Sequence, residues 1–201
     1  MIWLIAGFQI ARLQYEGGGD WYNDPEVIPN LVRFIKQHVN IELEDSQAVV
    51  HVSSPEIFNY PVVYLTGHGN LFFRDVDAEN LRKYLISGGF LYVDDDYGLD
   101  KYFRREIRKV FPDRELVELP LDHPLFSIYW KFPRGLPKIH EHYPGPPRAY
   151  GIFYGGRLVV LYTYNSNISD GWTDRHGDPP QKREEALKFG MNIILFATMY
   201  Q

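Results

Sequence analysis

The sequence of 201 residues contains no cysteine. It therefore cannot form a disulfide, a thiolate nucleophile, or a cysteine-ligated zinc or iron–sulfur site. A surplus of basic residues is also missing, because 21 Lys and Arg face 26 Asp and Glu and the formal net charge is -5. Nucleic-acid-binding proteins usually carry a basic surplus, so we expect no nucleic-acid partner.

Long hydrophobic runs are absent as well. No segment reaches the length of about 18 apolar residues that a membrane helix needs. Residues 1–7 are apolar, but they lack the basic region and the length of a signal peptide. The sequence leaves two interpretations open, a cytoplasmic protein and a chain with a truncated N-terminal segment at residues 1–7.

The composition is that of a folded protein. Hydrophobic residues make up 45% and charged residues 23% of the chain, which is unlike a disordered protein. A domain of this length buries roughly 70% of its unfolded surface, so it needs no covalent crosslinks. No linker interrupts the sequence, and we predict one α/β domain over residues 1–201 with a proline-rich, loop-rich excursion over 120–150.

Hydrophobic periodicity predicts alternating strands and helices. Strands are predicted over residues 8–15, 48–52, 62–66 and 90–94, with a short strand at 116–119 and a hairpin of 152–154 and 158–164. Helices are predicted over about 29–39, 75–87, 101–111 and 183–200, although 193–196 also suits a strand. This alternation indicates a three-layer α/β sandwich with a mostly parallel central sheet.

Three predicted strands run into polar loops, at residues 16–24, 66–70 and 94–98. The carboxyl ends of parallel strands share one edge of a sheet, and ligands bind in the crevice there. The glycine, aspartate and asparagine of each loop equally serve ordinary turns. Three such loops on one predicted edge favour a binding site.

Catalytic candidates come from two of these loops. Asp94, Asp95 and Asp96 are consecutive, so the middle side chain of an extended segment points away from its neighbours. Close carboxylates repel each other, which raises a pKa or recruits a cation. Asp95 and Asp96 are candidate acids or bases together with His68, whose imidazole titrates near neutral pH. Loop hydration and helix capping are the alternative role of the carboxylates.

Loop aromatics next to aspartate and asparagine suggest a ligand surface. Such rings stack on sugars or bases, although they also cover the core beneath long loops. The candidate ligand-binding residues are Asp20, Trp21, Tyr22, Asn70, Tyr97 and Trp172.

Histidines provide the candidate metal ligands. His140 and His142 flank a single residue, so an extended segment points both to one side, and His123 lies in the same excursion. These three histidines could ligate a divalent metal ion. No zinc motif such as His-Glu-x-x-His is present, and hydrogen-bonded loop histidines are the alternative.

Taken in order, several motifs resemble one family. They are Gly-Gly-Gly-Asp-Trp-Tyr-Asn-Asp-Pro at 17–25, Thr-Gly-His-Gly-Asn at 66–70, Gly-Gly-Phe-Leu-Tyr-Val-Asp-Asp-Asp-Tyr-Gly at 88–98, Leu-Pro-Leu-Asp-His-Pro-Leu-Phe at 119–126, Lys-Ile-His-Glu-His at 138–142 and Asp-Gly-Trp at 170–172. Over about residues 8–200 the chain resembles an uncharacterised bacterial family, the domain of unknown function 4159. The resemblance implies a flavodoxin-like fold similar to that of class I glutamine amidotransferases.

The resemblance also implies a setting. Related proteins often carry a signal or membrane segment and are associated with von Willebrand-type domain proteins and MoxR-type ATPases, which implies the cell envelope or periplasm. Amidotransferases carry a nucleophilic cysteine in the region that residues 93–98 resemble. Its absence here excludes thiol amidotransferase activity.

Three functions therefore remain as hypotheses. The first is a module that binds a small molecule, a carbohydrate or a partner protein in the crevice. The second is a hydrolase that uses Asp95 or Asp96 with His68, with or without a divalent metal ion. The third is a structural subunit of an envelope assembly.

Overall fold

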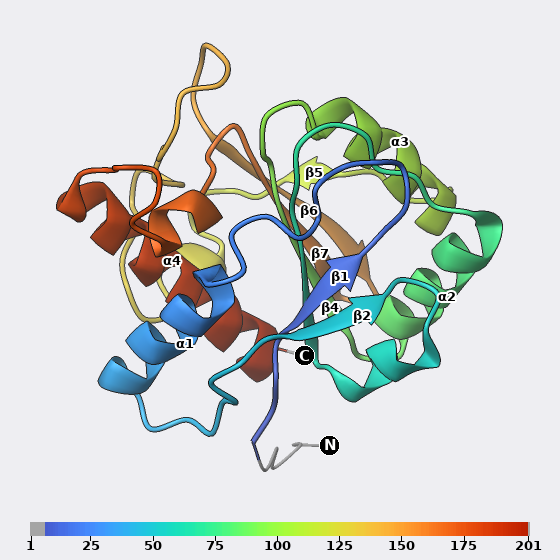
Figure 1. The fold of residues 1–201 in the computed structure, drawn as a ribbon, viewed down its shortest axis with the longest axis horizontal. Helices are drawn as coiled ribbons and strands as arrows, with labels where there is room; N and C mark the ends of the chain where they lie inside the picture. Colours follow the sequence, from blue (N-terminus) through green and yellow to red (C-terminus); the bar gives the residue numbers. More distant parts are fainter. Residues whose placement is uncertain (1–6, 201) are drawn as a thin grey trace.

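The computed structural model describes residues 7–200 of the chain (Figure 1). The elements, in chain order, are β1 (Ala11–Gln14), α1 (Val27–His38), β2 (Ala48–His51), η1 (Pro55–Asn59), β3 (Val62–Leu65), α2 (Asp75–Ile86), β4 (Phe90–Asp94), α3 (Asp100–Val110), β5 (Val117–Glu118), η2 (Pro124–Phe126), β6 (Arg148–Tyr154), β7 (Arg157–Tyr164), η3 (Ser169–Trp172) and α4 (Pro180–Met199). Apart from Gly7, the apolar segment predicted at residues 1–7 lies outside the described residues.

A seven-stranded sheet in the order β2-β1-β3-β4-β7-β6-β5 forms the centre of the fold. The first five strands of this order pair in parallel, and β6 and β5 add an antiparallel edge. The parallel strands follow the order of flavodoxin-like sheets. The predicted α/β class with a mostly parallel sheet is confirmed, as are the short strand β5 and the β6–β7 hairpin.

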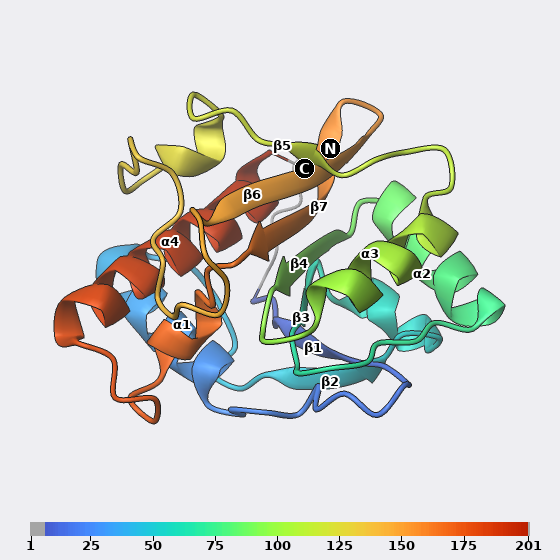
Figure 2. The ribbon, with the colours of Figure 1, turned by 90° about the horizontal axis from the view of Figure 1, so that it is seen from above.

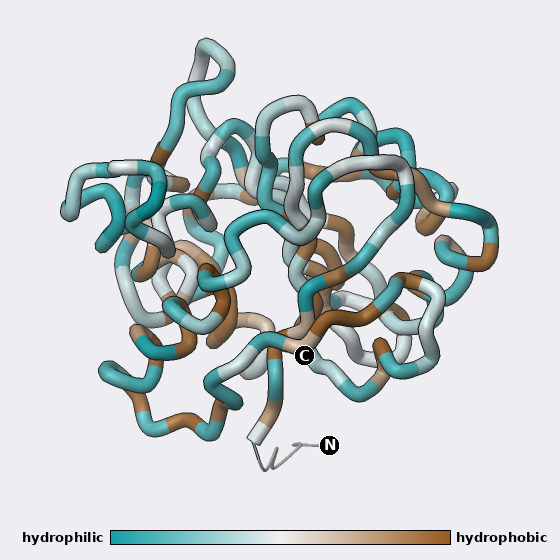
Figure 3. Tube along the Cα trace, viewed as in Figure 1, coloured by the Kyte–Doolittle hydropathy of each residue, from teal (hydrophilic) through white to brown (hydrophobic). Residues whose placement is uncertain are grey.

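Helices cover both faces of the sheet, which gives three layers. α1 and α4 pack on one face, and α2 and α3 pack on the other (Figure 2). Tyr64 and Tyr92 point to the α1/α4 side, whereas Val63 and Leu91 point to the α2/α3 side. The central strands are apolar because both of their faces are buried, while the loops along the upper edge are mostly hydrophilic (Figure 3).

Two helices begin earlier than predicted. α1 begins at Val27, because Pro29 lies in its first turn, where a backbone N–H has no partner within the helix. α4 begins at Pro180 and continues through residues 193–196, which settles the alternative of a strand there in favour of a helix. Within residues 7–200, the helices fall short of the length or the hydropathy required to cross a bilayer.

The connections place a crevice at the carboxyl edge of the sheet. β1 and β3 are neighbours, but β1 leads to α1 on one face and β3 leads to α2 on the other. The connections after the neighbouring strands β4 and β7 diverge in the same way, because they lead to α3 and α4 on opposite faces. Open α/β sheets bind ligands where neighbouring connections separate. The loops after these four strands are therefore the part of the fold to search for a site.

Packing of α4 depends on Gly190. A Cβ atom at this position would lie 2.7 Å from Leu31 Cδ1 and 2.8 Å from ring atoms of Trp172. Although alanine favours helices more than glycine does, we expect Gly190→Ala to lower the free energy of unfolding by about 1–3 kcal/mol, because overpacking outweighs propensity. Urea denaturation measures this change. Glu185→Ala, on the exposed part of the same helix, is the control, and a stabilised Gly190→Ala variant would contradict the prediction.

Candidate functional site

Arg12 fixes the loop that follows β1. Its guanidinium is buried and donates hydrogen bonds to the backbone carbonyl oxygens of Trp21 at 2.8 Å, Asn23 at 2.5 Å and Asp24 at 3.0 Å. A buried charge is tolerated only when its donors are satisfied, and these carbonyls satisfy Arg12. The loop is consequently held over the carboxyl end of the sheet with the Asp24 backbone fixed.

The loops after β1 and β3 pack directly against each other. Gly67 has a φ of +139°, and a Cβ atom there would lie 2.2 Å from the hydroxyl of Tyr15 and 3.2 Å from the backbone of Asp20. Tyr15 also donates to the carbonyl of Thr66 at 3.0 Å. Only glycine allows the two loops to come this close together. The close approach of the loops places His68 beside Asp20.

His68 is held between two carboxylates from different loops. Its Nδ1 lies 3.0 Å from Asp20 Oδ2, and its Nε2 lies 3.0 Å from Asp96 Oδ1. The backbone N–H of His68 also donates to Asp20 Oδ1. The structure thus brings together three of the residues that the sequence places on one edge, and both ring nitrogens of His68 are occupied.

This arrangement makes His68 a cation at neutral pH. The hydrogen bond to Asp96, followed by the charges of both carboxylates, raises the pKa of His68 to about 9. Burial opposes the ionisation of Asp96, but His68 lowers the pKa of this carboxyl below its ordinary value. His68 therefore acts as a fixed positive charge and not as a free base.

The three consecutive aspartates separate as an extended chain requires. Asp94 and Asp96 accept hydrogen bonds on the α1/α4 side, from Ser169 and Asn167 among others, while Asp95 Oδ2 accepts from the N–H of Asn165 at 3.0 Å. Burial raises the pKa of Asp94 to about 6. Asp95 therefore does not join the Asp20–His68–Asp96 chain.

The carboxyl of Asp95 titrates close to neutral pH. Burial, and then the charges of Asp100 and Asp94, raise its pKa to about 7. Its Oδ1 atom is buried and has no hydrogen-bond partner. A carboxyl of this kind can give or take a proton at neutral pH.

The loop-rich excursion returns to the same edge of the sheet. The N–H of Ile139 donates to the carbonyl of Ser166 at 2.9 Å, which places His140 beside η3. Nδ1 of His140 lies 2.9 Å from Asp170 Oδ2, and its Nε2 lies 2.9 Å from Asp178 Oδ2. The hydrogen bond to Asp170 raises the pKa of His140. His140 is held by two carboxylates, as His68 is.

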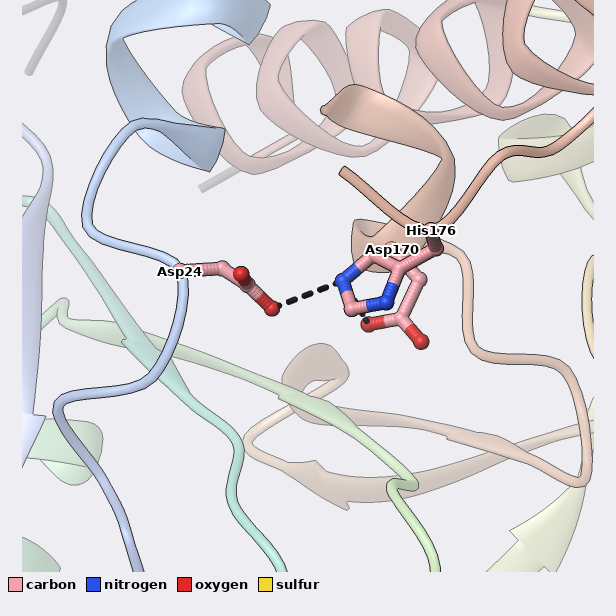
Figure 4. A group of neighbouring side chains, drawn as sticks. All are labelled: Asp24, Asp170 and His176. Carbon is pink, nitrogen blue, oxygen red and sulfur yellow. Dashed lines mark hydrogen bonds and ion pairs between the residues drawn. The ribbon is translucent and has the colours of Figure 1, made fainter. Parts of the chain in front are cut away.

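A further histidine joins the loops after β1 and β7 (Figure 4). Nε2 of His176 lies 2.9 Å from Asp24 Oδ2 and 3.9 Å from Asp170 Oδ1. One ligand-type atom from each of Asp24, Asp170 and His176 lies within 4.8 Å of the others. Two carboxylates and an imidazole at this spacing can hold a metal ion.

Asn167 connects the two histidine–aspartate groups. Its Nδ2 donates to Asp96 Oδ1 at 3.1 Å and to Asp170 Oδ2 at 2.9 Å. The side chain is buried, and its Oδ1 has no hydrogen-bond partner. One amide therefore bridges the Asp20–His68–Asp96 chain and the group around Asp170.

The histidines predicted as metal ligands do not form one set. His142 lies 5.9 Å from His140 between ring centroids, and its Nε2 is 3.9 Å from Asp96 Oδ1. Burial lowers the pKa of His142. His123 lies next to η2, where its ring packs 5.2 Å from that of Phe196 and its Nδ1 accepts from the Leu125 N–H.

The structure also gives the predicted ligand-binding residues different locations and different roles. Trp172 is 1% exposed, packs against Tyr64 and Tyr92, and donates through Nε1 to a carbonyl of α4, so it is a core residue that a ligand cannot reach. Asn70 supports the loop after β1 by donating to the carbonyl of Gly17. The remaining aromatic candidates are Trp21, which packs edge-on against Tyr22, and the exposed Tyr22 and Tyr97.

Tyr97 belongs to a cleft of about 590 Å³ at this edge. The ring of Tyr143 stacks on Tyr97 at 5.9 Å and on Tyr164 at 6.2 Å, with interplanar angles of 17° and 11°. These three parallel rings form the tyrosine ladder. The cleft is lined by His68, Gly69, Tyr97, Gly98, Asp100, Lys101, Tyr102, Tyr143 and Tyr164.

Sequence reasoning missed several of these residues. Tyr164 and His176 have no motif around them that separates them from ordinary strand or loop residues. Tyr143 is a loop aromatic directly after the motif at 138–142, but no pattern in the sequence directs its ring to the cleft. Asp24 lies in the polar loop at 16–24, and Asp170 lies in the Asp-Gly-Trp motif at 170–172. Their pairing with His176 depends on the path of the loops after β1 and β7, which no spacing reveals.

The comparison with protein families covers nearly the whole chain. A family model described as Domain of unknown function (DUF4159) matches residues 9–198. No curated protein matches the sequence. The matched range contains every residue of the cleft and of both histidine–aspartate groups.

The ion pairs of His68 predict a pH-dependent stability. Because the folded-state pKa is about 9 against an ordinary 6.5, the stabilisation is complete below about pH 6.5 and disappears as the pH rises through about 9. We expect the difference in unfolding free energy between wild type and His68→Gln to shrink over this range. Half of the His68 side chain is exposed, so screening keeps the effect small. Urea denaturation at pH 6, 7.5 and 9.5 tests this, and a constant or growing difference would contradict it.

Proposed function

The chain belongs to the DUF4159 family, and from its cleft we propose that it is a binding module for a neutral carbohydrate. The observation that carries the proposal is the tyrosine ladder of Tyr97, Tyr143 and Tyr164 along a cleft of about 590 Å³. This volume lies within the range of small-ligand sites. Aromatic faces bind the C–H faces of sugar rings, while neighbouring polar groups bind the hydroxyls.

The exposure of the ladder supports a stacking role. The ring of Tyr143 stacks with both neighbours, whereas Tyr97 is 57% exposed. The Tyr143 hydroxyl accepts a hydrogen bond from the N–H of Gly98, which fixes the middle ring. A large exposed aromatic side chain that is held in place loses little conformational entropy on binding.

The charges around the cleft favour a neutral ligand. The His68 cation is already matched by Asp20 and Asp96, and Asp100 is paired with Arg104 at 2.7 Å. The ammonium of Lys101 lies over the ring of Tyr102 at 4.6 Å. A phosphate or another strong anion would meet the ammonium of Lys101 together with the carboxylates of Asp20, Asp96 and Asp100, whereas sugar hydroxyls can donate to and accept from these same groups.

Binding of chitohexaose, cellohexaose and maltohexaose tests the proposal. We expect wild type to bind at least one of them, and Tyr97→Ala to weaken that binding roughly tenfold through the loss of one ring contact. Titration calorimetry measures both affinities. Tyr129→Ala is the matched control, because Tyr129 is 43% exposed and lies outside the cleft lining. Failure of wild type to bind all three, or equal effects of the two variants, would overturn the proposal.

A hydrolase is the second candidate, and the state of Asp95 favours it. The carboxyl is 2% exposed and is not among the residues that line the cleft, but its charge acts on Tyr143, which is. An acid or base with a pKa near the working pH is the most efficient in proton transfer. Asp95 would supply that group, while His68 would supply fixed positive charge.

Hydrolysis of p-nitrophenyl acetate and p-nitrophenyl glycosides tests this second function. We expect kcat/KM to change around pH 7, following the pKa of Asp95, and to fall at least about 100-fold in Asp95→Asn. The asparagine keeps an oxygen acceptor for the Asn165 N–H, so folding should be preserved. An absence of turnover by wild type, or an unchanged rate in the variant, would reject the hydrolase and leave the binding module.

A further inference from the structure

Three side chains from two distant segments converge outside the ligand cleft. Asp24 follows β1, Asp170 lies in η3 and His176 follows η3, and their side chains point toward one another (Figure 4). None of the three lines the cleft. Their side chains are 17%, 10% and 31% exposed, so the two aspartates are largely withdrawn from water while His176 is open to solvent.

We propose that Asp24, Asp170 and His176 form a binding site for a divalent first-row transition-metal ion. One carboxylate oxygen from each aspartate and Nε2 of His176 would be the ligands, and these atoms already lie within 4.8 Å of one another. Imidazole favours zinc, iron, cobalt and nickel over magnesium and calcium, while two carboxylates add hard oxygen ligands. Three protein ligands leave coordination positions for water.

Asp170 is already oriented to offer one oxygen. Its Oδ2 accepts hydrogen bonds from His140 Nδ1 and Asn167 Nδ2, both at 2.9 Å, which leaves Oδ1 directed toward His176. Groups that fix a ligating side chain in this way are typical of metal sites. Asp24 is fixed from the other side, because Arg12 binds its backbone carbonyl.

Asn167 supplies an independent observation. Its side chain is 1% exposed, and its Oδ1 has no partner although the same amide contacts Asp170. A buried polar oxygen without a partner is unfavourable by about 1–3 kcal/mol. This unpartnered oxygen belongs to the same amide whose Nδ2 holds Asp170 Oδ2, so an unsatisfied polar group lies next to the proposed ligand set.

Charge balance points the same way. His140 and His176 contact three carboxylates, those of Asp24, Asp170 and Asp178. A divalent cation placed among these three carboxylates would meet opposite charge in a partly buried setting, where such pairing lowers the cost of burying the carboxylates.

Metal titration of the full chain, purified without a histidine tag and freed of metal by chelation, tests the proposal. We expect one Co²⁺ ion per chain, seen as visible absorption bands, and one Zn²⁺ ion that displaces it, while Mg²⁺ and Ca²⁺ at the same concentrations do not. Asp24→Asn and His176→Gln should each weaken Zn²⁺ binding at least about 100-fold, since even groups that only orient ligands contribute 10–100-fold.

His51→Gln is the matched control. His51 also faces a carboxylate, since its Nε2 lies 3.5 Å from Glu16 Oε1, but it belongs to β2 and not to the proposed group. Its Zn²⁺ affinity should equal that of wild type. Circular dichroism establishes whether each variant is folded. If either Asp24→Asn or His176→Gln fails to fold, the Zn²⁺ affinity of the other variant still tests the ligand set.

The proposal is overturned by any of three results. Wild type that binds neither Co²⁺ nor Zn²⁺ stoichiometrically contradicts the site. Folded Asp24→Asn or His176→Gln protein with wild-type affinity contradicts the ligand set, as does an equal loss in His51→Gln. Displacement of Co²⁺ by Mg²⁺ or Ca²⁺ at equal concentration contradicts the class of metal. These outcomes do not depend on whether the cleft binds a carbohydrate.

Discussion

The structure depends on one constraint, the burial of three consecutive carboxylates at the end of the central strand β4. Asp94, Asp95 and Asp96 are each no more than 3% exposed. A buried carboxylate must be hydrogen-bonded or paired, and one strand end cannot provide enough donors by itself. Each of the three therefore draws donors from other segments. Asp94 bonds to Thr163 and Ser169, Asp95 to Asn165, and Asp96 to His68, Asn23 and Asn167.

The segment after β7 adopts a conformation that supplies hydrogen-bond donors to these carboxylates. Asn165 and Asn167 both have positive φ values, 56° and 51°, in the left-handed region that asparagine tolerates better than most residues. This backbone turns the Asn165 N–H toward Asp95 and the Asn167 amide toward Asp96. The same turn starts η3, so that Asp170 reaches Asn167 and His140. The ligand cleft and the proposed metal site are consequently supported by one hydrogen-bonded network.

Periodicity in the sequence was sufficient to predict the strands and helices and the α/β class, since the hydrophobic pattern of each element is local even where its sheet partners are distant in sequence. The shared carboxyl edge of parallel strands also predicts that Asp20, His68, Asp95 and Asp96 lie around one cleft. Asp20, His68 and Asp96 do converge, whereas Asp95 bonds to the Asn165 N–H instead. Sequence reasoning failed for Trp172, whose aspartate and glycine neighbours suggest a surface loop although η3 buries the ring beneath α4. It could not place Tyr143, which reaches the cleft through an excursion with no periodic pattern. The predicted likeness to amidotransferases, an envelope assembly, and partners with von Willebrand-type domains or MoxR-type ATPases stay predictions.

The geometry of the cleft favours a binding function over a catalytic one. A general base needs a free lone pair, but both nitrogens of His68 are committed to carboxylates. Asp96 is committed in turn to His68 and two amides, so it gains little as a nucleophile. Asp95 keeps an uncommitted oxygen, but it is 2% exposed and is not among the residues that line the cleft, four of which are tyrosines. Polar groups that already pair with one another form a rigid surface, which suits the binding of a ligand more than the transfer of a proton. The tyrosine ladder gives such a ligand an aromatic face on which to stack.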